Sequence, residues 1–138
     1  MEYIYCDYNS TTPVDESVVD AMAPFWRGDF GNPASQHHFG RKALAAVEKA
    51  RHSVARMLGA SDDEIVFTSG ATESNNMVVQ NTAVGIITSM TEHGSVYEPC
   101  RRLADGGRKV VFLGCDRAGR IQLSELEKVI TSDTCLVS

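Results

Sequence analysis

The sequence contains no apolar stretch of the roughly 20 residues that a transmembrane helix requires. It also contains no run of lysine and arginine, and its 13 basic residues are outnumbered by 18 acidic ones. Both features argue against a membrane protein and against a nucleic-acid-binding protein. The first residues have neither the basic region nor the long apolar region of a signal peptide, so we expect a cytoplasmic location.

Cysteine is scarce, with four residues in 138 and no Cys-x-x-Cys pair. This spacing gives poor support to a zinc knot or to a disulfide framework. We therefore expect Cys6, Cys100, Cys115 and Cys135 to be free thiols, three of them packed beside apolar residues as small hydrophobes. No cysteine has sequence neighbours that indicate the electropositive, accessible setting of a catalytic thiolate.

The composition is that of an ordinary soluble domain, with 43% hydrophobic and 22% charged residues. Apolar residues at helical spacing predict a helix over 14–27 that stops at Gly28. The same pattern predicts a longer helix over 39–58, which Gly59 ends as a C-cap. The stretch 31–38 between them is dense in turn formers and predicts an irregular loop.

Strands and helices alternate through the rest of the chain. The predicted elements are, in order, a strand at 64–68, a helix to about Gln80, an apolar run at 83–88, a helix through Val96, Cys100 and Leu103, a strand at 109–113, a helix ending at Ile130 and a strand at 134–138. Ser124 and Glu127 have the spacing of a capping box for the last of these helices.

This alternation predicts an α/β fold with right-handed crossovers. Parallel strands are buried on both faces and need neighbours on both edges, yet the last apolar run enters the sheet and no segment leads out of it. We therefore expect a sheet that is incomplete in this chain, as in a fragment or one half of a split protein. The predicted organisation is an N-terminal segment at 1–13 followed by part of one large domain at 14–138.

A glycine turn lies between the strand predicted at 64–68 and the helix that follows it. Backbone N–H groups of a first helical turn, together with the helix dipole, stabilise an anion such as phosphate. Gly70 would let the backbone approach the anion closely, and the Thr72 hydroxyl could donate one more hydrogen bond. Spacing alone leaves a second interpretation open, which is an ordinary helix start with a turn of small residues.

His93 follows the apolar run at 83–88, and ligand sites of open α/β sheets gather at the carboxyl ends of strands. Imidazole stacks on flat aromatic rings and exchanges protons near neutral pH. The residue is therefore a candidate catalytic group, with an exposed loop histidine as the alternative. His52, beside two arginines in the long helix, is predicted to be a surface residue.

The loop after the first helix carries Asn32, His37 and His38. Three interpretations stay open for this cluster: a metal site, a loop that contacts substrate, or a turn that faces solvent. Metal is the weakest of them, because no carboxylate stands at ligand spacing. We therefore predict no metal site.

Four motifs occur in an order and at a spacing that resemble one known family. They are Cys6-Asp7-Tyr8-Asn9-Ser10-Thr11-Thr12-Pro13, Gly31-Asn32-Pro33-Ala34-Ser35-Gln36-His37, Ile65-Val66-Phe67-Thr68-Ser69-Gly70-Ala71-Thr72-Glu73-Ser74-Asn75 and Thr91-Glu92-His93. Together they resemble the N-terminal motifs of NifS/IscS-type cysteine desulfurases, in the class V aminotransferase group. The resemblance covers essentially the whole chain and implies part of the large pyridoxal-phosphate-binding domain of a fold type I enzyme.

The resemblance also implies roles for individual residues. Gly70, Ala71 and Thr72 would hold the phosphate of pyridoxal 5'-phosphate, and His93 would stack on its pyridine ring and assist proton transfer. Asn32 and His37 would lie in a loop at the substrate entrance. The implied reaction converts L-cysteine to L-alanine and leaves a persulfide for iron-sulfur cluster assembly, in a homodimer that delivers sulfur to a scaffold protein.

Three parts that such enzymes need have no counterpart in this sequence. They are the Schiff-base lysine, which follows a histidine in similar enzymes, the aspartate that pairs with the pyridine nitrogen, and the cysteine of the mobile loop. A Schiff-base lysine is partly desolvated, whereas the chain's lysines look exposed and none follows a histidine: Lys42, Lys49, Lys109 and Lys128. We therefore predict no turnover by this chain alone and expect it to need the remaining polypeptide, a second chain or a partner.

Other differences from the family bear on the fold and on the substrate. The connection from Gln80 to Val84 is shorter than usual, which loops tolerate at small cost. The strand at 64–68 would pair with strands supplied later, which leaves open edges. A selenocysteine lyase, a cysteine sulfinate desulfinase or a non-catalytic phosphate-binding module remain alternatives.

Overall fold

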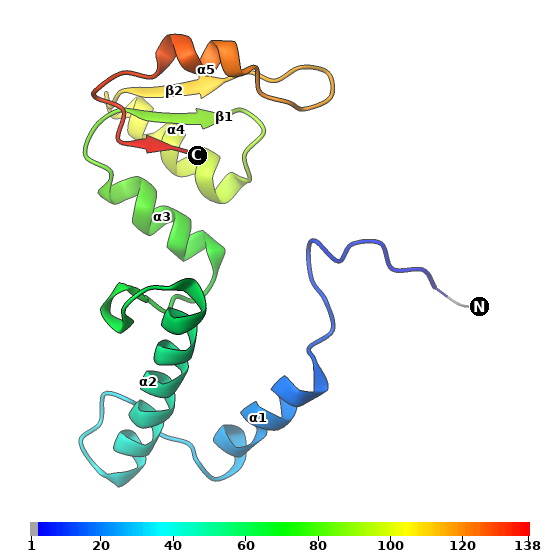
Figure 1. The fold of residues 1–138 in the computed structure, drawn as a ribbon, viewed down its shortest axis with the longest axis vertical. Helices are drawn as coiled ribbons and strands as arrows, with labels where there is room; N and C mark the ends of the chain where they lie inside the picture. The colour runs from blue at the N-terminus through cyan, green and yellow to red at the C-terminus, as the bar shows by residue number, and fades with distance from the viewer. Residues whose placement is uncertain (1–2) are drawn as a thin grey trace. The chain divides into compact units, whose positions relative to one another are not determined.

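A computed structural model describes residues 3–138, and it divides the chain into two compact units, one ending at Val66 and the other beginning at Phe67 (Figure 1). We call them the first and the second unit and describe each by itself. None of the helices in the described part of the chain is long and apolar enough to cross a membrane.

The first unit contains two amphipathic α-helices. Helix α1 spans Glu16–Arg27, and α2 spans His38–Leu58. Gly59 ends α2 in the left-handed conformation, with φ of 68°, as its predicted C-cap role requires. Both predicted helices are confirmed to within two residues, because the signals that mark them are local.

The start of α1 has a side-chain cap. The Asp15 carboxylate accepts a hydrogen bond from the Ser17 backbone N–H at 2.9 Å. Hydrogen bonds from the Ser17 hydroxyl and then from its N–H lower the pKa of Asp15. The cap therefore satisfies one of the otherwise unpaired donors of the first helical turn.

The predicted strand at 64–68 is wrong. A 3₁₀ turn, η1, occupies Asp62–Glu64, and residues 65–68 form no strand. Val66 and Phe67 are 59% and 49% exposed. A strand forms only when its backbone pairs with a neighbour, and no strand among residues 3–138 pairs with this segment.

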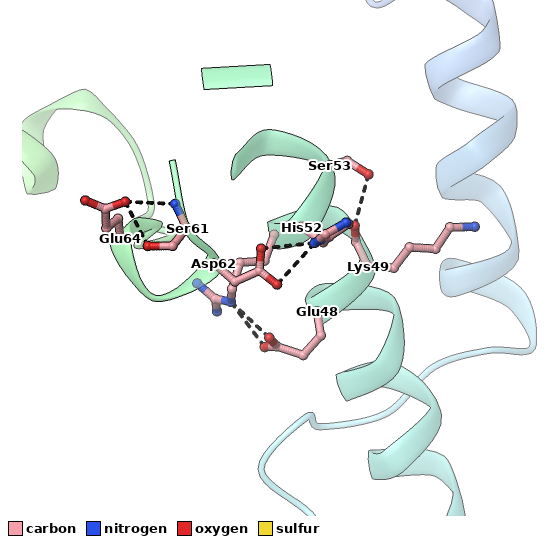
Figure 2. A network of polar contacts seen from close by, with 8 residues as sticks. Glu48, Lys49, His52, Ser53, Ser61, Asp62 and Glu64 are labelled. Carbon is pink, nitrogen blue, oxygen red and sulfur yellow. Dashed lines mark hydrogen bonds and ion pairs between the residues drawn. The ribbon is translucent and has the colours of Figure 1, made fainter. Parts of the chain in front are cut away.

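Polar contacts join the end of α2 to η1 (Figure 2). Nδ1 of His52 lies 3.1 and 3.3 Å from the two Asp62 carboxylate oxygens, and the histidine side chain is 61% exposed, which confirms it as a surface residue. Ser61 and Glu64 form a capping box in which the Glu64 carboxylate accepts from the Ser61 N–H and hydroxyl. These contacts stabilise η1 and join it to α2.

The second unit is an α/β structure with three parallel strands in the order β2-β1-β3 (Figure 1). Its elements are α3 Ala71–Asn81, β1 Ile86–Ser89, α4 Gly94–Asp105, β2 Val110–Leu113, α5 Leu123–Val129 and β3 Leu136–Val137. Ile86 pairs with Val110 on one side and with Leu136 on the other. All four residues of the central strand are buried. The predicted α/β alternation is confirmed here, and the sheet is short and incomplete.

The core of the second unit lies where α3 and α4 meet β1. Its buried members are Val79, Ile86, Val96 and Cys100, and Leu103, Val110, Phe112 and Leu136 pack against them. Cys100 is fully buried. This burial raises the pKa of its thiol, and the negative charge of Glu92 raises it further. All four cysteines are free as predicted, but Cys6, Cys115 and Cys135 are exposed, so only Cys100 packs as a small hydrophobe.

The capping box predicted at Ser124 and Glu127 is also wrong. Helix α5 begins at Leu123, so Ser124 lies inside the first turn instead of before it. Its N-cap residue is Gln122, whose side chain makes no capping hydrogen bond. The Ser-x-x-Glu spacing that misplaces the box here is the spacing that forms one at Ser61.

Candidate functional site

The turn before α3 leaves backbone donors available. Gly70 is the N-cap residue, with φ of 156° and no side-chain cap, and no atom lies within 4 Å of the position that a Cβ would take. The N–H groups of Ala71, Thr72 and Glu73 belong to the first helical turn, whose donors have no partner within a helix. The space beside Gly70 is thus open, and donors of this kind bind anions at helix starts.

Side chains brace this turn from within. The Glu73 carboxylate accepts hydrogen bonds from the Ser69 hydroxyl and N–H, both at 2.7 Å. These two bonds, the hydroxyl first, lower the pKa of Glu73. The Thr68 hydroxyl lies 2.8 Å from that of Ser74 and donates to the Gly70 carbonyl oxygen. The turn therefore keeps its shape through its own side chains.

His93 is the N-cap residue of α4. Its Nδ1 accepts a hydrogen bond from the Ser95 backbone N–H at 3.1 Å and lies 2.9 Å from the Ser95 hydroxyl oxygen. The histidine is exposed, whereas Ser95 is only 7% exposed. One edge of the ring is thus fixed to the helix, and the rest is accessible.

A contact between helices connects His93 to α3, the helix that begins at the Gly70 turn. Asn75, one helical turn beyond Ala71, donates from Nδ2 to the Ser95 hydroxyl oxygen at 2.9 Å. Helices α3 and α4 pack along each other within the second unit. The structure therefore connects two of the predicted site features, the glycine turn and the histidine, through Asn75 and Ser95.

Asn32 and His37 lie in the first unit and serve its local structure. The Asn32 side chain accepts from the Ala34 N–H at 2.9 Å, and Nδ1 of His37 accepts from the Gly40 N–H at 3.3 Å as the N-cap of α2. The neighbouring His38 is exposed and contacts the Phe39 ring. Within residues 3–138 no group of three or more His, Cys, Asp or Glu side chains could hold a metal ion.

The site fits the phosphate end of a cofactor better than its covalent attachment. Gly70 and the N–H groups that follow it suit an anion, and the exposed His93 ring suits contact with a flat ring. All four lysines are exposed: Lys42, Lys49, Lys109 and Lys128. None of them has the partly desolvated surroundings of a Schiff-base lysine.

Sequence reasoning missed Asn75 and Ser95. A signal for Asn75 is its position four residues after Ala71, on the same face of the helix. A signal for Ser95 is its place two residues after a histidine that precedes a helix, where a cap accepts an N–H. Their contact with each other could not be foreseen, because it joins two helices.

Comparisons with known proteins identify the family of this chain. The family described as aminotransferase class-V matches residues 4–138. The cysteine desulfurase IscS of Dictyoglomus turgidum is 45% identical over 142 residues, which cover 98% of this chain and 36% of that protein. The mitochondrial cysteine desulfurase of Saccharomyces cerevisiae is 48% identical over 143 residues, which cover 98% of this chain and 29% of that protein.

Solved structures are similar as well. A NifS-like protein has a TM-score of 0.85 at 43% identity, covering 94% of this chain and 37% of the other. A structure of SspA in complex with cysteine has a TM-score of 0.83 at 37% identity, covering 94% and 40%. The chain spans about a third of the length of the curated relatives that it matches, in their N-terminal part. The expected fold, an incomplete piece of a fold type I pyridoxal-phosphate domain, is thereby confirmed. The chain belongs to the class V aminotransferase family and resembles the NifS/IscS-type cysteine desulfurases within it.

Proposed function

We propose that this chain is the N-terminal portion of a pyridoxal-phosphate-dependent cysteine desulfurase, present as part of a longer polypeptide or as one half of a split protein. The observation that carries the proposal is the connection of the Gly70 turn to His93 through Asn75 and Ser95. Identity of 45–48% to two cysteine desulfurases along almost the whole chain supports it. The reaction would convert L-cysteine to L-alanine and pass sulfur onward as a persulfide for iron-sulfur cluster assembly.

Two groups of residues would hold the cofactor. Gly70, Ala71 and Thr72 would bind its phosphate through backbone N–H groups and the Thr72 hydroxyl, assisted by the dipole of α3. The exposed ring of His93 would lie against the pyridine ring and take part in proton transfer. When bound, pyridoxal phosphate supplies the electron sink of the reaction, while the protein orients the reacting groups.

The proposal also includes two residues of the loop before α2. In this proposal Asn32 and His37 border the substrate entrance, on the loop that joins α1 to α2. Their local hydrogen bonds to Ala34 and Gly40 would fix the shape of that loop. We further propose a cytoplasmic homodimer that takes L-cysteine as substrate and a scaffold protein as sulfur acceptor.

Turnover would require groups from outside this chain. The exposure of every lysine supports this view, because a Schiff-base lysine needs partial desolvation. The chain alone is therefore expected to bind phosphate compounds weakly and to produce no alanine. The remaining polypeptide or a second chain would supply the lysine, the aspartate and the reactive cysteine.

The test compares the full polypeptide that carries this chain with residues 1–138 alone. Each is incubated with pyridoxal phosphate, L-cysteine and a thiol that reduces the persulfide to sulfide, and alanine and sulfide are measured after the intact mass of every chain is known. Alanine from the full polypeptide alone supports the proposal, and His93→Ala should then slow turnover while leaving the fold intact. If the full polypeptide forms no alanine from L-cysteine but forms it from selenocysteine or cysteine sulfinate, that compound would replace L-cysteine as the proposed substrate. If alanine forms from none of these three compounds, the proposal that the full polypeptide is an enzyme of this kind is overturned.

A further inference from the structure

The contacts of His93 determine which of its ring nitrogens carries the proton. A backbone N–H can only donate, so the 3.1 Å contact from the Ser95 N–H requires a lone pair on Nδ1. A neutral imidazole has one protonated nitrogen and one acceptor nitrogen. With Nδ1 as the acceptor, the proton of the neutral ring lies on Nε2.

The Ser95 hydroxyl acts in the same direction. Its oxygen accepts a hydrogen bond from Asn75 Nδ2 at 2.9 Å. The same oxygen also lies 2.9 Å from His93 Nδ1. Because Nδ1 is an acceptor, the hydroxyl hydrogen points to it. The order of donation is therefore from Asn75 to Ser95 and from Ser95 to His93.

Burial makes this arrangement firm. Ser95 is 7% exposed, so water has little access to its hydroxyl. A hydrogen bond in such surroundings is electrostatically stronger than one in water, and successive bonds polarise one another. Nε2 of His93, in contrast, makes no hydrogen bond to any residue in the described part of the chain.

The other capping histidine serves as an internal comparison. His37 caps α2 through Nδ1 as well, but with the Gly40 backbone N–H alone, at 3.3 Å. A helix start in this molecule is thus capped without a hydroxyl behind the ring. A histidine cap therefore does not need a hydroxyl contact, and the one at His93 is additional, as the Ser17 hydroxyl is at the Asp15 cap.

We propose that Ser95, oriented by Asn75, is a positioning residue that holds His93 with its proton on Nε2. The ring then offers an N–H donor on its free side. It can accept a proton on Nε2 only after the contact from the Ser95 N–H to Nδ1 is broken and the contact with the Ser95 hydroxyl is reversed. Asn75 belongs to the helix that starts at the Gly70 turn. The hydrogen bonds from Asn75 to Ser95 and from Ser95 to His93 therefore also fix the ring relative to that turn. The catalytic meaning of this inference rests on the proposed function, whereas the position of the proton does not.

The experiment is ¹⁵N NMR of the full polypeptide with ¹⁵N-labelled histidine rings, with His93 assigned by its loss in His93→Gln. In the unaltered protein we expect a protonated Nε2 and an unprotonated Nδ1. Ser95→Ala should shift the ratio of the two neutral forms toward Nδ1–H by about fivefold, the effect of one hydrogen bond. Ser95→Thr, which retains the hydroxyl, should restore the ratio.

Thr88→Val is the matched control, because it removes another buried hydroxyl of the second unit. Thr88 is fully buried, and its Oγ1 has no partner within residues 3–138, so the His93 signals should not change. A proton on Nδ1 in the unaltered protein, or unchanged signals in Ser95→Ala, would overturn the inference.

A parallel assay of alanine release separates this inference from the function. If Ser95→Ala shifts the ratio and lowers kcat with little change in KM, the positioning role is supported. If the ratio shifts but the unaltered protein makes no alanine, the proposed function fails while the position of the proton stands. If alanine forms normally and the signals of Ser95→Ala do not move, the inference alone fails.

Discussion

The two units of the chain show similar apolar patterns and very different burial. In the second unit all four residues of β1 are buried, and Cys100 has no exposed surface. In the first unit α1 has no buried residue, and α2 buries only Gly40, Ala43 and Ala55. An amphipathic pattern thus determines that a helix forms, whereas burial of its apolar face depends on what packs against it.

The apolar surface of the first unit is extensive. Met22, Phe25 and Trp26 of α1 are 43%, 41% and 68% exposed. A hollow of about 340 Å³ lies between the end of α1 and α2, with Phe25, Phe30 and Val47 among the residues that line it. The contrast teaches that the second unit has a core of its own, while the first leaves most apolar side chains of α1 exposed.

The largest expected effect concerns the core of the second unit. Ile87→Ala removes a side chain that is 2% exposed from the central strand, and it should lower the free energy of unfolding by about 2–5 kcal/mol. The matched change in the first unit is Ile4→Ala, at a side chain that is 89% exposed, with an effect within about 0.5 kcal/mol. Urea unfolding measures both, and equal effects would break the comparison.

A smaller effect tests a tightly packed place of the first unit. Gly40→Ala would put a Cβ 2.1 Å from the Ser35 carbonyl oxygen, so the start of α2 must shift, at a cost of about 1–3 kcal/mol. At Gly28 no atom lies within 4 Å of the added carbon, and Gly28→Ala should be close to neutral. Hydrogen exchange of the α2 amides distinguishes them; similar protection in both variants would mean that α2 has no fixed start.

Acid should loosen one turn in each unit. Hydrogen bonds from Ser61, its N–H first, lower the pKa of Glu64 below 4.5, and those from Ser69 do the same for Glu73. A lowered folded-state pKa gives stability that is present above the unfolded value and is lost as pH falls through the folded one. The NMR signals of the Ser61 and Ser69 amides should therefore shift as the pH falls below about 4.5.

The matching amide variants provide the control for the acid titration. Glu64→Gln should abolish the movement at Ser61 only, and Glu73→Gln that at Ser69 only. A movement that persists in its own variant would assign the titration to another group.

The smallest expected effect concerns the helix starts. His37 caps α2, whereas α3 has no side-chain cap, so inorganic phosphate should perturb the amides of Ala71 and Thr72 and leave that of Gly40 unchanged. Thr72→Val should weaken the perturbation, while Thr82→Val at the other end of α3 should not. Equal perturbation at Gly40 would indicate unspecific anion binding.

What could be predicted from the sequence is mostly what is local. The bounds of α1 and α2 follow from apolar spacing and glycine stops, which act within a few residues. The strand predicted at 64–68 does not form, because a strand needs a paired neighbour and the local sequence does not show whether one is present. The same four-residue spacing occurs at Ser61 and at Ser124. It forms a capping box only at Ser61, because Ser124 lies inside the first turn of α5.

The candidate site divides in the same way. The Gly70 turn and His93 could be located from single segments, since each lies between a strand-like run and a helix. Asn75 and Ser95 could not, because their contact depends on how two helices pack. The residues proposed to bind the cofactor are visible in a motif, whereas those proposed to orient them become visible only in three dimensions.

The position of β1 between β2 and β3 has a consequence for the newly made polypeptide. Ile86 pairs with Leu136, so the central strand must wait for a partner that follows 136 − 86 = 50 residues later. At bacterial and eukaryotic elongation speeds this interval lasts roughly 2.5–10 s. Both edges of β1 stay open until Val110 has been made, and the edge that pairs with Leu136 stays open for the whole interval. Chaperone capture during translation should therefore concentrate on this window, and it should end when the last strand emerges from the exit tunnel.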